Sequence, residues 1–296
     1  MTSETIVETP AEEPVVVKEK KKTDWKAEAK GIFWLVLAVL GFHSFVAKPF
    51  YIPSESMLPG LLVSDRLVVT KFPYGWSFAS LTFHPIGFIP GRVLGHLPER
   101  GDVVIVTPPG TSEDYIKRVI GLPGDTLEVR GGTVILNGVP VKRGPLHYVD
   151  IPDYGGDPSA DGLTCDPRVY PGALTEKPGG KNSCRLAIIR ETLPNGRSYD
   201  TVESGYIWQA DDYAPTKIPA DHVFLMGDNR DHSADSRFSL AEKGLGGAVP
   251  WENLGGRAEF ITFSLDGGAV WWNPISWLTS LRGNRAGTTL HPSRGG

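Results

Sequence analysis

An uncharged apolar run at Gly31–Ala47 constrains this chain more than any other feature of its sequence. As a helix, its roughly 17 residues would rise about 25 Å, slightly less than a ~30 Å hydrocarbon core, and the flanking Trp25 and Tyr51 would reach the interface. Six lysines precede the run: Lys18, Lys20, Lys21, Lys22, Lys26 and Lys30. Because positive charge stays on the cytoplasmic side, the run predicts one membrane-spanning helix with a cytoplasmic N-terminus.

Two other interpretations of the run fit its sequence less well. A cleaved signal peptide would have small residues one and three positions before the cut, whereas Phe45/Ala47 and Phe42/Ser44 put a ring at the outer position. A buried soluble helix would show a polar stripe, and the run has none. His43 is polar, and a place near the helix end, within reach of the headgroups, accounts for it. These features favour an uncleaved anchor.

The chain after the apolar run has the pattern of a β-rich domain. With 35 Gly and 25 Pro, many short strands joined by turns are expected rather than long helices. Eight short apolar or alternating segments fit this pattern: 66–70, 102–106, 115–120, 126–129, 133–136, 186–189, 222–226 and 258–263. Asn137-Gly138 predicts a hairpin, because both central positions of such a turn need positive φ. The net charge of −4 gives no reason to expect a nucleic-acid partner.

These patterns divide the chain into five parts. Residues 1–24 are expected to form a disordered cytoplasmic tail, since their Glu-, Pro-, Val- and Lys-rich sequence has no helical or strand period. The anchor takes residues 25–48, and a β-domain takes residues 49–143 and 213–266. Residues 144–212, rich in Gly, Pro and Asp, form an inserted β-rich subdomain. Residues 267–296 form a C-terminal tail, with tryptophans either at the membrane interface or in a flap on the core.

Cys165 and Cys184 are the two cysteines of the chain, and both lie in the inserted stretch. If this part lies outside the cytoplasm, a disulfide between them is expected, and it would close a loop of 184 − 165 = 19 residues. Two free thiols are the alternative. No CxxC spacing is present, so the sequence does not predict a zinc site.

Ser56 is the candidate nucleophile. It lies with Ser54 and Glu55 between Pro53 and Pro59, so the backbone around it is restrained and turn-like. A serine hydroxyl needs a base to remove its proton before it attacks. The Gly-x-Ser-x-Gly motif of α/β-hydrolases is absent around Ser56, and the seven histidines are scattered along the chain.

Lys117 is the candidate base. It lies in an alternating segment that puts it on the same face as Val119, opposite Ile116 and Arg118. Burial on that face would favour the neutral amine: lowering the pKa of a lysine from ~10.4 to roughly 7–8 takes about 3–5 kcal/mol of desolvation. From the pattern alone, a solvated lysine on an edge strand remains the alternative.

A third polar block, residues 227–237, directly follows a predicted strand. Its carboxylates, arginines and hydroxyls would either bind a ligand or build an internal hydrogen-bond network. Asp228, Asp231 and Asp235 offer oxygens to a metal, but two arginines among them supply the positive charge that a cation would bring. We therefore expect no metal and no other cofactor.

Three segments together resemble the signature blocks of bacterial type I signal peptidases, in the order in which that family has them. They are residues 53–59 (PSESMLP), 115–125 (YIKRVIGLPGD) and 227–237 (GDNRDHSADSR). Any one of these segments alone would be weak evidence for the family, whereas three in order behind a membrane anchor are very specific evidence. The resemblance covers about Lys48 to Phe263.

The resemblance implies a mainly β fold, with an antiparallel, barrel-like catalytic domain behind one transmembrane helix, and a serine endopeptidase with a Ser/Lys dyad. By it, Ser56 is the nucleophile, Lys117 is the general base, Ser54 joins the Ser56 N–H in the oxyanion hole, and Ser233 orients the amine. Residues that would support the third block are Asp228, Arg230, Asp235 and Arg237. The apolar lining of the substrate pockets would be Phe50, Ile52, Met57, Leu61, Tyr115 and Ile116.

The implied substrates are exported pre-proteins, cut after small residues in an Ala-x-Ala pattern through an acyl-enzyme. The enzyme is expected to act as a monomer on the periplasmic side of a bacterial cytoplasmic membrane. Glu55 and Gly60 stand where the family commonly has Gly and Thr, and His232 stands where Asn is frequent, so His232 is a rival assistant to Lys117. Two alternatives stay open: a specialised maturation peptidase of a secretion system, and an inactive membrane-tethered protein that binds exported polypeptides.

Overall fold

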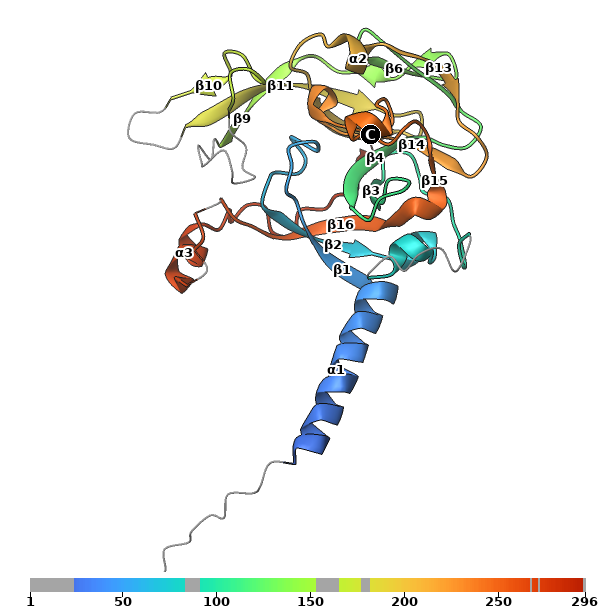
Figure 1. The fold of residues 1–296 in the computed structure, drawn as a ribbon. Helices are drawn as coiled ribbons and strands as arrows, with labels where there is room; N and C mark the ends of the chain where they lie inside the picture. Colours follow the sequence, from blue (N-terminus) through green and yellow to red (C-terminus); the bar gives the residue numbers. More distant parts are fainter. Residues whose placement is uncertain are drawn as a thin grey trace, which may run out of the picture. The chain divides into compact units, whose positions relative to one another are not determined.

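The computed structural model describes residues 24–82, 91–152, 165–176, 182–266, 268–270 and 272–294 (Figure 1). Of the tail predicted to be disordered, residues 1–24, all but Asp24 lie outside the described residues. Internal contacts divide the chain into two units, Met1–Val39 and Leu40–Gly296. The fold is mainly β, as the sequence predicts: within the described residues, antiparallel sheets follow one long N-terminal helix.

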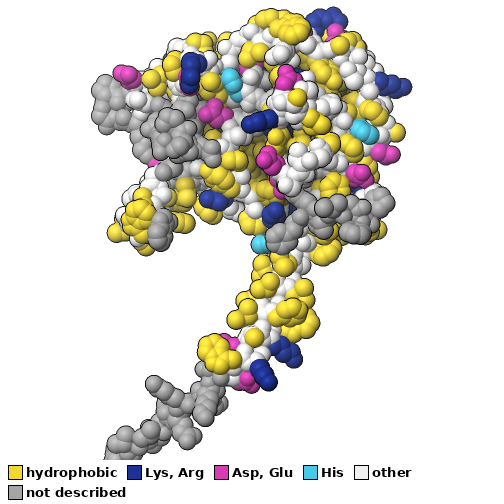
Figure 2. Space-filling view, viewed as in Figure 1, with side chains coloured by type: hydrophobic (Ala, Val, Ile, Leu, Met, Phe, Trp, Pro, Cys, Tyr) yellow, Lys and Arg dark blue, Asp and Glu magenta, His cyan; other side chains and the backbone are white. Residues whose placement is uncertain are grey.

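Helix α1, Trp25–Phe45, contains most of the apolar run. It begins after Asp24, whose carboxylate accepts a hydrogen bond from the Lys26 backbone N–H (3.1 Å). At 21 residues, the helix is about 31 Å long, close to the ~30 Å of a hydrocarbon core. Apolar side chains cover much of its surface (Figure 2). Among them, Phe33 is 61% and Leu35 63% exposed. By length and composition, α1 is therefore able to cross a membrane.

The largest sheet is antiparallel and joins strands that are far apart in the sequence, in the order β1-β2-β16-β3-β4-β14-β15. These strands are β1 (Ala47–Tyr51), β2 (Asp65–Thr70), β16 (Leu254–Ser264), β3 (Val103–Val106), β4 (Tyr115–Gly121), β14 (His222–Met226) and β15 (Val249–Pro250). In Figure 1, β16 (orange) runs beside β2 (blue), and Ala258 pairs with Val69. The late strand β16 thus connects the β1-β2 pair to β3 and β4.

One core cluster fastens this sheet to the turn that follows β1. It consists of Ile52, Met57, Leu61, Leu67, Val69, Val103, Ile105, Ile116, Ala258, Ile261 and Leu290. Burying one such side chain stabilises a fold by roughly 1.5–3 kcal/mol. Three members of the cluster come from the turn itself: Ile52, Met57 and Leu61. The turn is therefore held against the sheet by its own buried side chains.

A second, four-stranded sheet has the order β13-β5-β6-β7. Its strands are β13 (Tyr213–Lys217), β5 (Thr126–Arg130), β6 (Thr133–Leu136) and β7 (Val139–Pro140). Leu136 pairs with Val139 across Asn137 and Gly138, whose φ angles are 52° and 79°. The hairpin predicted from the Asn-Gly pair is confirmed, because both residues adopt positive φ.

The third sheet is built around β11 (Ser183–Thr192). The other strands are β8 (Lys142–Arg143), β9 (His147–Pro152), β10 (Leu174–Thr175), β12 (Arg197–Val202) and β17 (Ser293–Arg294). The predicted insertion, residues 144–212, supplies β9 to β12 and the short helix α2 (Trp208–Asp211). However, β8 precedes that stretch and β17 comes from near the C-terminus. The Gly-, Pro- and Asp-rich composition of residues 144–212 therefore does not predict the bounds of the third sheet, because its strands also come from outside that stretch.

Short helices fill several connections. They are η1 (Phe72–Tyr74), η2 (Phe78–Ser80), η3 (Arg230–His232), η4 (Leu240–Glu242) and η5 (Trp251–Asn253), all of the 3-10 type, and α3 (Pro274–Thr279). Helix α3 lies in the predicted C-terminal tail and begins at Asn273, whose side chain accepts from the Ile275 N–H (3.1 Å). Ile275 is 70% exposed and Leu278 72%, so this helix presents apolar surface (Figure 2).

The chain beyond α3 packs against the β-domain. Leu290 is buried in the main core cluster, and Arg285 forms an ion pair with the buried carboxylate of Asp65 (2.5 Å). Strand β17 also pairs with β12. The predicted tail at residues 267–296 is therefore not one piece, because its last described part belongs to the folded domain.

Candidate active site

The turn between β1 and β2 carries Ser56. A backbone hydrogen bond from Ser64 N–H to Ile52 O (2.9 Å) closes it. Met57 and Leu61, on either side of the turn's centre, are each 1% exposed and lie in the core. Ser56 is buried too, at 7% exposed. Because the turn is tied down at its ends and through its middle, the Ser56 hydroxyl is held in one position.

Lys117 reaches Ser56 from β4. Its Nζ donates hydrogen bonds to Ser56 Oγ (2.9 Å) and to the Ile116 carbonyl oxygen (3.0 Å). Lys117 is 4% exposed, because β4 lies between β3 and β14. The alternative of a solvated lysine on an edge strand is therefore wrong.

The surroundings of Lys117 favour its uncharged form. Burial lowers the pKa of Lys117 from 10.5 to about 8, although the negative charges of Asp235 and Asp228 act in the opposite direction. An amine with this pKa loses its proton slightly above neutral pH, which an exposed lysine does not do. The pair thus has the two properties of a serine nucleophile with a lysine base: contact, and an amine that loses its proton near pH 8.

Two further donors lie at the Ser56 hydroxyl. Ser54 is exposed, and its Oγ lies 3.4 Å from Ser56 Oγ. Within the part of the chain that the structure describes, the Ser56 backbone N–H donates to no acceptor. Donors in such positions stabilise a negative oxygen when it forms beside the attacked carbon.

Ion pairs hold the third block in place. Arg118 of β4 donates to both carboxylate oxygens of Asp228 (2.7 and 2.6 Å). Asp235 accepts from the Arg237 guanidinium (3.0 and 2.8 Å) and from the Gly227 backbone N–H (3.0 Å). All of these charged groups are buried. They form the internal network that the sequence offered as one of two alternatives for this block.

Arg230 extends this network into the third sheet. Its guanidinium donates to both oxygens of Glu191 (2.8 and 2.5 Å) and to the Tyr199 hydroxyl (3.1 Å). Glu191 lies on β11 and is fully buried. Glu191 was not predicted as a site residue, although an acidic residue that closely follows the apolar segment 186–189 was a usable signal.

A cavity of about 610 Å³ opens beside the Ser56/Lys117 pair. Its walls are Phe50, Tyr51, Ile52, Pro53, Ser54, Ser56, Ile105, Glu113, Asp114, Tyr115, Ile116, Lys117, His232, Ala234 and Lys243. Four of the six predicted pocket residues are among them. The other two, Met57 and Leu61, are buried in the same core cluster as Ile52 and Ile116, and their place in the substrate pockets stays a prediction.

Ser233 and His232 belong to the third block, and neither is seen to hydrogen-bond to Lys117 in the part of the chain that the structure describes. Ser233 is 4% exposed, and its hydroxyl has no hydrogen-bond partner among the described residues, so the predicted bond to Lys117 is not seen. His232 lines the cavity, its ring lies 5.4 Å from that of Tyr170, and burial lowers its pKa. The orienting role of Ser233 and the assisting role of His232 stay predictions.

Carboxylates near the site are engaged by arginines. Within the described residues, no group of three or more His, Cys, Asp and Glu side chains is placed to hold a metal ion. The carboxylates of Asp228 and Asp235 were two of the three candidate metal ligands in the sequence. They accept hydrogen bonds from Arg118 and Arg237 instead.

Known proteins share the sequence of this chain over most of its length. The family model described as "Signal peptidase, peptidase S26" matches residues 25–263. Signal peptidase I of Rickettsia typhi is 33% identical over 287 residues, covering 90% of this chain and 94% of that protein. Signal peptidase I of Rickettsia prowazekii is 32% identical over 285 residues, with the same two coverages. A solved signal peptidase I structure from Enterococcus faecalis is 22% identical, with a TM-score of 0.26, covering 55% of this chain and 97% of that one.

Taken with the β fold and the buried serine site, these matches define the chain as a serine endopeptidase. The class already suggested by its three motifs is thereby confirmed. The chain belongs to the signal peptidase family, peptidase S26, because the family model and the Rickettsia relatives both cover most of its residues.

Proposed function

We propose that this chain is a membrane-anchored endopeptidase that removes signal peptides from exported pre-proteins with a Ser56/Lys117 dyad. The observation that carries the proposal is the 2.9 Å hydrogen bond between Lys117 Nζ and Ser56 Oγ at a buried site. Family membership supports the choice of substrate. A buried lysine with a lowered pKa, in contact with a serine hydroxyl, has the basicity and the reach that a general base needs.

In the first half of the reaction, the neutral amine of Lys117 takes the proton of Ser56 as Oγ attacks the carbonyl carbon of the scissile bond. The carbonyl oxygen becomes negative, and the Ser56 N–H and the Ser54 hydroxyl donate to it. The C–N bond then breaks, and the protonated Lys117 gives its proton to the leaving amine, which is the new N-terminus of the mature protein. Ser56 is left as an ester of the signal peptide.

In the second half, water replaces the leaving amine. Lys117 takes a proton from the water as its oxygen attacks the ester carbon, and the same donors stabilise the second tetrahedral intermediate. The ester bond breaks, Ser56 Oγ takes the proton back from Lys117, and the signal peptide leaves as a carboxylic acid, which loses its proton to bulk water. Each turnover consumes one peptide bond and one water molecule, and it returns Ser56 and Lys117 to their starting states.

The cavity suits an extended peptide. Its walls come from residues 50–54 and 113–117. Within the described residues, β1 pairs with β2, and Tyr115 to Lys117 pair with β3, each on one side. A pre-protein segment would hydrogen-bond to the main chain of both stretches, as peptides do at open strand edges. In this proposal the apolar walls from Phe50, Ile52 and Ile116 contact the small side chains of an Ala-x-Ala segment.

Helix α1 is the proposed membrane anchor. Its length, its composition and the lysines before it favour one span, with the N-terminus in the cytoplasm and the catalytic domain on the periplasmic side of a bacterial cytoplasmic membrane. Ser56 follows Ala47, the end of the apolar run, by 56 − 47 = 9 positions. The partners in this proposal are the lipid bilayer and the signal-peptide region of a pre-protein.

The test uses the full chain in detergent micelles with a pre-protein that carries an Ala-x-Ala cleavage site. We expect wild type to cut after the second alanine and Ser56→Ala and Lys117→Arg to be inactive, since arginine does not give up its proton. Matched controls are Ser293→Ala on β17 and Lys142→Arg on β8, both exposed residues, which should cleave like wild type. Cleavage by Ser56→Ala would refute the proposal.

The same assay separates the alternatives. A wild-type enzyme that leaves generic Ala-x-Ala pre-proteins intact but cuts a narrow set would be a specialised maturation peptidase. A wild-type chain that binds pre-proteins with the same affinity as Ser56→Ala, and cuts none, would be an inactive binding protein.

A further inference from the structure

Asn229 holds the main chain on both sides of Ser56. Its backbone N–H donates to the Ser56 carbonyl oxygen (3.1 Å), and its side-chain Nδ2 donates to the Glu55 carbonyl oxygen (3.1 Å). Asn229 is fully buried, so water does not compete for these bonds. The peptide units before and after the nucleophile are therefore both tied to the third block.

The bond to the Glu55 carbonyl has a consequence for the Ser56 N–H. These two groups belong to one planar peptide unit, and in a trans peptide they point in opposite directions. A hydrogen bond that fixes the carbonyl oxygen thus fixes the direction of the N–H as well. In the proposed reaction this N–H is a donor of the oxyanion hole, and its aim decides how well it stabilises the intermediate.

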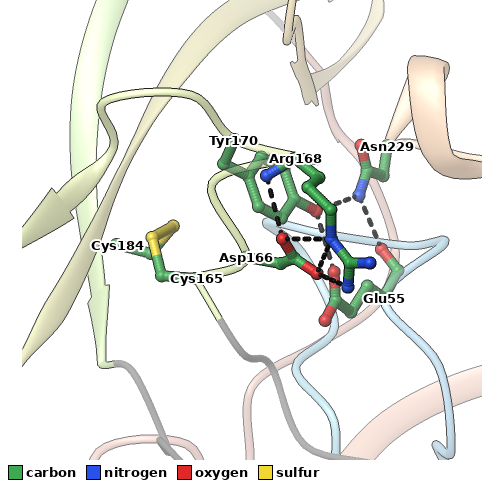
Figure 3. The surroundings of a disulfide bond; sticks show 7 residues. All are labelled: Glu55, Cys165, Asp166, Arg168, Tyr170, Cys184 and Asn229. Carbon is green, nitrogen blue, oxygen red and sulfur yellow. Dashed lines mark hydrogen bonds and ion pairs between the residues drawn. A yellow bond between two sulfur atoms is a disulfide. The ribbon is translucent and has the colours of Figure 1, made fainter. Parts of the chain in front are cut away.

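Tyr170 completes the cluster from the insertion (Figure 3). Its hydroxyl accepts from Asn229 Nδ2 (2.8 Å) and donates to Glu55 Oε2 (2.9 Å). Burial and the negative charge of Glu55 raise the pKa of Tyr170, so the hydroxyl keeps its proton and continues to donate. The two hydrogens of the Asn229 amide nitrogen accordingly go to the Glu55 main chain and to Tyr170.

A disulfide-held turn carries Tyr170 (Figure 3). Cys165 is bonded to Cys184 of β11, and both are buried. After Cys165, the Asp166 carbonyl oxygen accepts from the Tyr170 N–H (2.8 Å), and the Asp166 carboxylate accepts from the Arg168 N–H (2.8 Å) and guanidinium. The disulfide lies 170 − 165 = 5 positions before Tyr170 and fastens the turn to the central strand of the third sheet.

We propose that Tyr170 is a positioning residue of the active site, which acts on Ser56 through Glu55 and Asn229 and is kept in place by the disulfide-held turn. The proposal rests on the role proposed above for Ser56. It gives the insertion a part in the reaction, namely to aim the oxyanion donor. It also gives a reason for a glutamate at position 55, because glycine would offer the Tyr170 hydroxyl no carboxylate.

The expected effect falls on the chemical step. A displacement of about 1 Å in a catalytic group costs roughly 100-fold in rate, so removal of one steadying hydroxyl should lower kcat by about 10- to 100-fold. The cavity walls do not include Tyr170, so KM should stay within about twofold. The pH midpoint set by Lys117 should not move, because the contacts of its amine are unchanged.

The first experiment compares Tyr170→Phe with wild type in the full chain, using steady-state cleavage of a signal-peptide substrate and thermal unfolding. Tyr148→Phe is the matched control: it removes the same oxygen from a tyrosine of the insertion that is 60% exposed. We expect Tyr170→Phe to lose kcat with KM and the pH midpoint kept, and Tyr148→Phe to match wild type. A kcat for Tyr170→Phe within about twofold of wild type would overturn the proposal, as would a loss of equal size in Tyr148→Phe.

The second experiment tests the link through Glu55. Glu55→Gln keeps a side-chain oxygen that accepts from the Tyr170 hydroxyl, whereas Glu55→Leu removes it. We expect Glu55→Gln to keep most of the wild-type kcat and Glu55→Leu to fall to the level of Tyr170→Phe. Equal activity in the two Glu55 variants would show that the carboxylate is not the partner through which Tyr170 acts.

The third experiment tests the disulfide with the double variant Cys165→Ala/Cys184→Ala, in the wild-type and the Tyr170→Phe background. If the disulfide acts by placing Tyr170, the double variant lowers kcat in the first background and adds little in the second. If the kcat losses of the cysteine double variant and of Tyr170→Phe instead multiply when combined, the disulfide does not act through Tyr170. Ser56→Ala keeps the two proposals apart: activity in that variant refutes the proposed function, whereas an inactive Ser56→Ala beside a fully active Tyr170→Phe refutes only this inference.

Discussion

Arg230 and Glu191 form a buried, bidentate ion pair, at 2.8 and 2.5 Å, between the loop that follows β14 and the central strand of the third sheet. The Tyr199 hydroxyl donates to the same carboxylate (2.9 Å). The insertion therefore contacts the third block through this pair as well as through Tyr170. It is part of the scaffold of the active site and not an appendage to it.

We predict that Glu191→Ala destabilises the catalytic domain by about 3–5 kcal/mol, because it leaves the guanidinium of Arg230 buried without its partner. The measurement is chemical unfolding in detergent. Asp200→Ala on the neighbouring strand is the control, since its pair with Arg190 is partly exposed to solvent and is worth at most about 1 kcal/mol. Equal losses in the two variants would contradict this account of the ion pair.

We predict that kcat/KM rises with pH and levels off above about pH 8. The active form of Lys117 is the free amine, and its pKa is lowered to about 8. Below that value the rate should fall about tenfold per pH unit, since the uncharged fraction falls by that factor. A pH series with one peptide substrate measures the midpoint. A midpoint near 10.5, the ordinary value, would mean that burial does not act on this amine.

We predict that Lys117→Met is inactive yet more stable than wild type at pH 7. The folded-state pKa of Lys117 lies below the unfolded-state value, so below pH 8 the folded protein must bury a charged amine, and this cost disappears as pH rises from about 8 to 10.5. The shift corresponds to about 3 kcal/mol. Thermal unfolding at pH 7 and pH 10 measures it. The stability advantage of the variant should shrink at pH 10, and a constant difference would contradict the prediction.

We predict that Arg285→Ala destabilises the turn that carries Ser56. Arg285 donates to Asp65 (2.9 and 2.5 Å) and to the Gly60 carbonyl oxygen (2.9 Å). Asp65 is fully buried, so loss of a partner should cost about 2–4 kcal/mol and lower activity. Arg294→Ala, at an exposed position of β17, is the control for loss of charge near the C-terminus. Unfolding and cleavage assays on both variants decide the matter.

Sequence patterns correctly predicted the structural elements whose conformation depends on residues close together in the chain. The apolar run is helical as far as Phe45, and Asn137-Gly138 makes its hairpin, because few other backbone conformations suit those residues. The order of the three motifs singled out Ser56 and Lys117 as a pair. The structure brings their side chains into contact at 2.9 Å.

The sequence did not predict hydrogen-bond and ion-pair partners that come from strands far apart in the chain. Nothing near Tyr170 in the sequence points to Glu55, and nothing near Glu191 points to Arg230, because each pair forms only when separate sheets come together. The burial of Lys117 likewise follows from the place of β4 inside the sheet and not from alternation alone. The burial of Met57 in the core was not predicted either, because an apolar residue beside a nucleophile suits a pocket and a core equally well.

Strand order also bears on how the enzyme is made. Ser56 precedes β2 and Lys117 lies on β4, and β16 (Leu254–Ser264) sits between those two parts of the sheet. A ribosome delivers this strand late, so a growing polypeptide has its hydroxyl and its amine on two parts of the sheet that lack the strand between them until residues 254–264 have emerged. We expect the nascent protease to be harmless to itself and to its neighbours during synthesis, and to gain activity in a single late step.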